Sequence, residues 1–80
     1  MTLFHGTNRD ITDGTATGTF FTDDLTLAVT YASRKDGSSI YVLNIDENSI
    51  SDIFSKDMFN EHFISRCFIP IHCFICLKVC

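Results

Sequence analysis

The N-terminal third of the chain alternates short apolar segments with a polar stretch. Residues 3–5 are apolar or aromatic up to Gly6, which predicts a strand running into a turn. Residues 8–18 are rich in Asn, Asp, Gly and Thr and predict a loop. Residues 19–22 (Thr-Phe-Phe-Thr) are β-branched and aromatic, and they predict a second short strand.

Residues 23–35 carry the pattern of an amphipathic helix. Four apolar residues recur at the spacing of one buried helix face: Leu25, Ala28, Val29 and Ala32. Thr22 or Asp23 can cap the N-terminus of this helix, and Gly37 is a natural stop. We therefore expect a helix from Asp23 to Lys35.

The second half of the chain begins with its most apolar strand candidate. Residues 40–45 (Ile-Tyr-Val-Leu-Asn-Ile) predict a strand buried on both faces, followed by a turn over 46–51. Residues 51–63 predict a weaker helix, capped by Ser51. The predicted order of elements is strand, loop, strand, helix, strand, helix and apolar tail. This order predicts an α+β fold, with a small mixed or antiparallel sheet and one or two helices.

Composition and charge narrow the function classes. Eighty residues allow one small domain, and 45% hydrophobic residues exclude disordered and low-complexity classes. A net charge of −4 argues against a basic nucleic-acid surface, so we expect no nucleic acid as partner. The polar, threonine-rich start does not resemble a signal peptide, and we expect a cytoplasmic protein.

The chain divides into an acidic segment, 1–62, and an apolar tail, 63–80. All ten acids and four of the six bases lie in the first segment, which gives −6, whereas the tail holds two bases. The tail is too polar for a membrane span, with Arg66, Pro70 and His72 inside it, so we expect no membrane association. It predicts one or two buried strands, or unnatural sequence left by a frameshift or early stop.

All four cysteines lie in the tail: Cys67, Cys73, Cys76 and Cys80. One Cys-x-x-Cys beside His72 leaves a structural zinc site and a redox dithiol as alternatives. The residues between the cysteines are Phe and Ile without a glycine turn, so we expect buried or adventitious thiols and no metal.

Two small groups of residues suggest a binding site. His5-Gly6-Thr7 follows the first apolar residues, where a histidine can present its ring nitrogens and a glycine lets a ligand approach the backbone. Phe20 and Tyr31 are eleven residues apart, and two converging aromatic rings suit a flat heteroaromatic ligand. The alternatives are an ordinary surface histidine and two core aromatics.

Four motifs in order resemble the ADP-ribosyltransferase superfamily, in its branch with a His-Tyr-Glu triad. They are LFHGT, GTFFTD, AVTYA and IYVLNID, and together they span residues 3–46. The resemblance implies an ADP-ribosyltransferase-like half-domain in which residues 1–62 form the NAD-binding segment. By the same resemblance, His5 bonds a ribose hydroxyl of NAD and the Gly6 backbone meets the nicotinamide carboxamide. Thr7 completes that motif, Phe20 is the first stacking aromatic, and Tyr31 stacks on nicotinamide.

The third member of the family's triad is a late glutamate, and the sequence offers only Glu61 on the predicted helix. The expected function is therefore NAD binding, with transfer of ADP-ribose to an unknown protein acceptor if the protein is active. The alternative is a non-catalytic acidic binding or inhibitor protein, for example a phage or mobile-element anti-defence protein, that retains the fold and docks on a basic partner.

Overall fold

The computed structural model describes residues 1–33, 39–57 and 62–78, and it confirms the predicted α+β class. The strands are β1 (Thr2–Thr7), β2 (Gly14–Thr15), β3 (Phe20–Phe21), β4 (Ser39–Asn44), β5 (Phe54–Lys56), β6 (Phe63–Ser65), β7 (Ile69–Pro70) and β8 (Ile75–Lys78). The helices are α1 (Leu25–Ala32) and α2 (Ile50–Ile53), with 3₁₀ turns η1 (Glu47–Ser49) and η2 (Ile71–Cys73).

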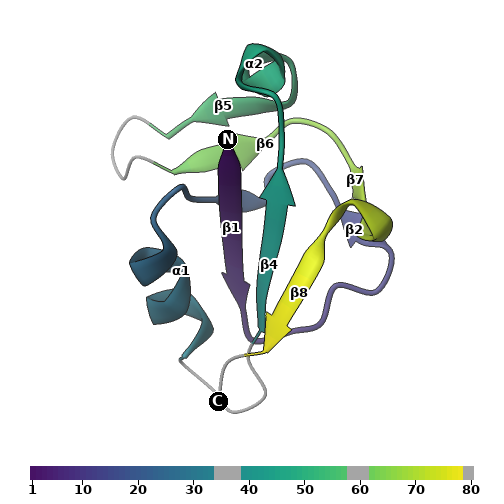
Figure 1. Ribbon diagram of the computed structural model, residues 1–80. Helices are drawn as coiled ribbons and strands as arrows, with labels where there is room; N and C mark the ends of the chain where they lie inside the picture. The colour runs from purple at the N-terminus through teal and green to yellow at the C-terminus, as the bar shows by residue number, and fades with distance from the viewer. Residues whose placement is uncertain (34–38, 58–61, 79–80) are drawn as a thin grey trace.

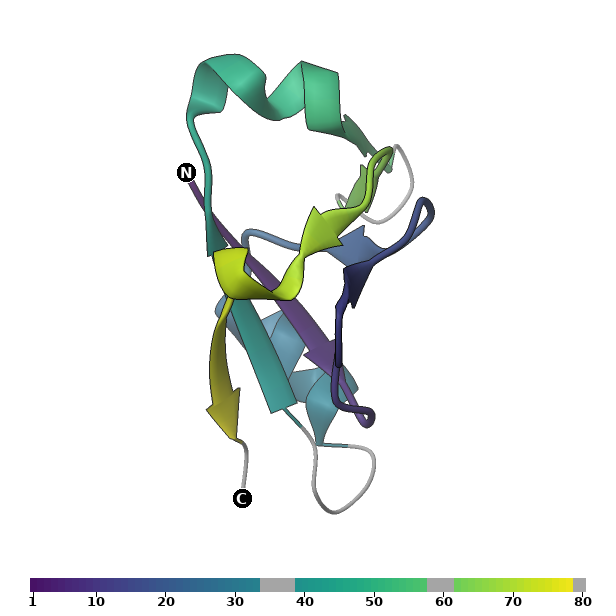
Figure 2. The ribbon, with the colours of Figure 1, turned by 90° about the vertical axis from the view of Figure 1, so that its right-hand side faces the viewer.

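The strands form three small antiparallel sheets, in the orders β1-β4-β8, β3-β6-β5 and β2-β7 (Figure 1). Helix α1 lies on the side of β1 away from β8, and it is behind β1 and β4 when the molecule is viewed from the β8 side (Figure 2). The apolar tail supplies a strand to each sheet, since β6, β7 and β8 pair with β3, β2 and β4.

Side chains alternate across β1 and β4 and form two separate apolar clusters. Leu3 and Leu43 pair across the two strands and belong to the larger cluster, together with Phe21, Phe54, Phe63 and Ile69. Ile40 belongs to the smaller cluster with Ala28 and Ala32 of α1, against which Phe4 and Val42 pack. Both faces of β4 are therefore buried, as the apolar run over 40–45 predicts.

Helix α1 packs on β1 through backbone at a glycine. A Cβ built on Gly6 would lie 1.9 Å from the carbonyl oxygen of Ala28. Only a residue without a side chain allows the helix to approach this closely. The structure therefore gives Gly6 a packing role that the sequence analysis did not consider.

The predicted helix over 23–35 is shorter in the described residues and buries less. It begins at Leu25, with the Asp24 side chain accepting hydrogen bonds from Thr26 N–H (2.9 Å) and Leu27 N–H (3.3 Å), so neither Thr22 nor Asp23 is the cap. Ala28 and Ala32 are buried, but Leu25 and Val29 are exposed. The backbone atoms of α1 nearest to Gly6 belong to Ala28 and Ala32, so these two small residues lie at the contact with β1. Gly37, the predicted stop, lies outside the described residues.

The helix predicted over 51–63 is wrong. The described residues of this segment hold one helical turn, the end of α2, after which Phe54 is extended at φ −124° and ψ 150°, where β5 begins. Burial of Phe54 in the larger cluster and pairing of β5 with β6 override the local helical pattern. The predicted loop over 8–18 likewise contains a strand, β2, which pairs with β7.

The tail is partly buried. Phe63, Ser65 and Ile69 are buried, whereas Ile75 and Leu77 of β8 are exposed. Cys67, Cys73 and Cys76 are free and exposed, so of the two expectations for the thiols, buried or adventitious, burial is wrong for these three. Cys80 lies outside the described residues. Within the described ranges no helix has the length and apolarity to cross a bilayer, and no group of three or more metal-ligating side chains gathers.

Candidate functional site

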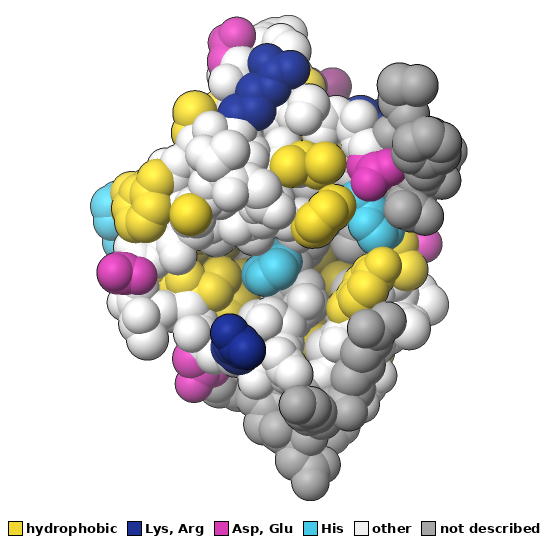
Figure 3. Space-filling view, turned by 180° about the vertical axis from the view of Figure 1, so that it is seen from behind, with side chains coloured by type: hydrophobic (Ala, Val, Ile, Leu, Met, Phe, Trp, Pro, Cys, Tyr) yellow, Lys and Arg dark blue, Asp and Glu magenta, His cyan; other side chains and the backbone are white. Residues whose placement is uncertain are grey.

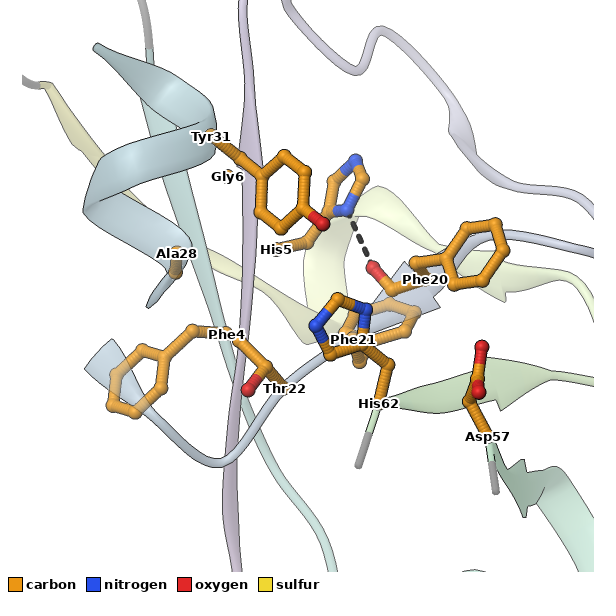
Figure 4. A pocket seen from close by; sticks show the side chains of 10 residues that line it. All are labelled: Phe4, His5, Gly6, Phe20, Phe21, Thr22, Ala28, Tyr31, Asp57 and His62. Carbon is orange, nitrogen blue, oxygen red and sulfur yellow. Dashed lines mark hydrogen bonds between the residues drawn. The ribbon is translucent and has the colours of Figure 1, made fainter. Parts of the chain in front are cut away.

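A cavity of about 370 Å³ lies between α1, the end of β1, β3 and the β5–β6 hairpin. This volume falls within the usual range of ligand sites. Its lining is mostly aromatic and apolar: Phe4, His5, Gly6, Phe20, Phe21, Thr22, Ala28, Tyr31, Asp57 and His62 (Figure 4). Seen from behind, the molecule carries histidine side chains among hydrophobic ones (Figure 3).

The sequence-predicted residues fall into three groups. His5, Gly6, Phe20 and Tyr31 all line the cavity, so the structure brings together residues that lie up to 26 positions apart in the chain. Thr7 does not line it, and its hydroxyl accepts a hydrogen bond from Arg9 N–H (3.1 Å). Glu61 lies outside the described residues.

One edge of β1 is open where it lines the cavity. Phe4 N–H donates to Thr22 O (2.7 Å) and Thr22 N–H donates to Phe4 O (2.8 Å), so the Phe4 backbone groups point away from β4. Backbone groups of alternate residues point to the same strand edge, so the N–H and C=O of Gly6 point the same way. Among the described residues no hydrogen-bond partner meets them. The cavity thus presents one adjacent backbone donor and acceptor.

The His5 ring has a defined tautomer. Its Nδ1 lies 2.7 Å from Phe20 O, and because a carbonyl can only accept, Nδ1 carries the proton. Burial lowers the pKa of His5, and the hydrogen bond to Phe20 O opposes this only in part. The ring is therefore neutral at pH 7, and Nε2 is left as a hydrogen-bond acceptor.

The aromatic walls come from β3 and α1. Phe20 is 50% exposed and Tyr31 is 38% exposed, whereas Phe21 is 1% exposed and packs tilted against His5 at 5.6 Å between ring centroids. Phe20 and Tyr31 are therefore not core aromatics, the alternative that the sequence left open, whereas Phe21, the neighbour of Phe20 on β3, belongs to the larger apolar cluster.

Two further residues of the site come from the β5–β6 hairpin. Asp57 is the one carboxylate among the described lining residues, and His62 is buried with its ring inside the cavity (Figure 4). Their backbones meet where Asp57 N–H donates to His62 O. Neither residue was predicted for the site, because the sequence pattern over 51–63 predicted a helix. The three residues of β5, Phe-Ser-Lys, carry no apolar–polar alternation, so the local sequence offered no signal for a strand there.

Comparisons of the chain with models of protein families, with curated proteins and with solved structures found no match.

Proposed function

We propose that this cavity binds the nicotinamide end of NAD and that the protein is an ADP-ribosyltransferase-like domain. The observation that carries the proposal is the open edge of β1, where the Gly6 N–H and C=O face the cavity between His5 and the aromatic walls. A primary carboxamide offers one acceptor and one donor side by side, which complements that backbone pair.

The surrounding groups suit the rest of the ligand. Neutral His5 can accept a hydrogen bond at Nε2 from a ribose hydroxyl. The rings of Phe20 and Tyr31 offer aromatic faces to a pyridinium, whose positive charge they attract. Asp57 adds a negative charge, and no Lys or Arg is among the described lining residues.

We also propose that the protein acts in the cytoplasm. The three cysteines that the structure describes are free thiols, as is usual in a reducing compartment.

We expect wild-type protein to bind NAD in calorimetry and Tyr31→Ala to weaken binding by about 1–2 kcal/mol, through lost stacking and buried area. Val29→Ala is the matched control, because Val29 is a comparably exposed residue of the same helix outside the cavity lining. Its binding should equal that of wild type. Absence of heat with wild type at millimolar NAD would contradict the proposal.

Turnover should be slow even where NAD binds. Cleavage of the nicotinamide–ribose bond develops positive charge on the sugar, and a fixed carboxylate must stabilise it. Asp57 is one methylene shorter than the glutamate implied by the resemblance, and a misplacement of about 1 Å can cost on the order of 100-fold in rate.

Two measurements test this: release of nicotinamide from NAD labelled in the nicotinamide ring, and transfer of label to a cell lysate from NAD labelled in its ADP-ribose part. We expect little above the enzyme-free rate. Rapid release that is abolished by Asp57→Asn or by Glu61→Gln would refute this prediction and would identify the carboxylate that acts.

A further inference from the structure

The His62 ring contacts both aromatic walls of the cavity. It lies 5.7 Å from the Tyr31 ring at 78° and 6.2 Å from the Phe20 ring at 79°, between centroids, so it is edge-to-face with each. No direct ring pair joins Phe20 to Tyr31, both of which the structure describes. The imidazole is thus the ring that bridges them (Figure 4).

The His62 ring is buried, but no side-chain hydrogen bond to another described residue fixes its position. His62 is 5% exposed. Edge-to-face contacts are individually weak. A flat ligand ring that also forms hydrogen bonds with the Gly6 backbone makes more interactions in this place than the His62 imidazole does. Such a ligand can therefore displace the imidazole.

We propose that His62 is an internal competitor of the ligand: its imidazole fills the place beside Phe20 and Tyr31 that a flat heteroaromatic ring occupies when the site is loaded. This inference rests on the proposed function and adds regulation of the same site. A site that is open for only a fraction of the time binds its ligand more weakly by that fraction. His62 therefore lowers the affinity and selects for ligands that also bond the backbone of β1.

The first test titrates nicotinamide into wild type and His62→Ala by calorimetry. The variant should bind about tenfold more tightly, because the place beside the two rings is vacant. His62→Phe keeps a ring in the same place and should bind no more tightly than wild type. His72→Ala replaces an exposed histidine of η2, outside the cavity lining, and should match wild type.

Free imidazole provides a readout that does not depend on NAD. It should raise the melting temperature of His62→Ala but not that of wild type, and it should compete with nicotinamide for the variant. In wild type, NMR contacts between the His62 and Tyr31 ring protons should disappear as nicotinamide is added, a measurement that requires no variant to fold.

The outcomes separate the two proposals. The proposal that His62 competes with the ligand is refuted if His62→Ala binds nicotinamide equally or more weakly than wild type. It is also refuted if nicotinamide binds wild type while the His62–Tyr31 contacts persist. Neither result contradicts the proposed function. If imidazole binds His62→Ala but neither nicotinamide nor NAD binds either protein, the proposed function is refuted. The proposal that His62 competes with nicotinamide is then refuted as well.

Discussion

Gly6→Ala is expected to destabilise the protein by about 3 kcal/mol or more, the upper range for overpacking. The added Cβ would lie 1.9 Å from the carbonyl oxygen and 2.8 Å from the carbonyl carbon of Ala28. Both are backbone atoms of α1, so no rotamer change relieves the contact and the helix must move. A domain of this size has few kcal/mol to lose. Urea denaturation monitored by circular dichroism measures the change.

Two variants control for the interpretation. Gly18→Ala meets no atom within 4 Å but must adopt φ +97°, so it should cost less, about 1–2 kcal/mol. Gly6→Ala combined with Ala28→Gly should not recover stability. The clash is with the backbone carbonyl oxygen of residue 28, which remains when Ala28 is replaced by glycine. Recovery in that double variant would show that the clash is with the Ala28 side chain and not with the helix backbone.

Phe21→Ala is expected to cost about 3–5 kcal/mol, as large aromatic truncations in cores do. The Phe21 ring packs edge-to-face on Phe54 at 5.0 Å and stacks with Phe74 at 6.1 Å, and it also contacts His5. Its removal empties the centre of the larger cluster. The measurement is again the free energy of unfolding.

Phe20→Ala is the matched control on the same two-residue strand. Because Phe20 is half exposed, its truncation should cost less than about 1 kcal/mol of stability, while weakening NAD binding by up to about tenfold through lost stacking. A large loss of stability in Phe20→Ala with little loss in Phe21→Ala would show that the orientation of β3 has been assigned the wrong way round.

The sequence correctly predicted those elements whose formation depends on residues within the element itself. The apolar run of β4 and the presence of a helix at α1 are both local, because the burial pattern acts within a few residues, although the cap is Asp24 and not the predicted Thr22 or Asp23. The segment over 51–63 failed for the opposite reason. Its strand β5 is stabilised by pairing with β6 and by burial of Phe54, which depend on residues that a local pattern does not contain.

The sequence by itself determined the α+β class, β4, α1 and the four residues His5, Gly6, Phe20 and Tyr31 that meet at the cavity. Only the tertiary structure decided which of Phe20 and Phe21 faces the core, because a two-residue strand has no alternation until β6 pairs with it. It also brought Asp57 and His62 into the cavity through the β5–β6 hairpin. Local patterns specify which residues can form an element, whereas long-range pairing specifies which side of that element the cavity meets.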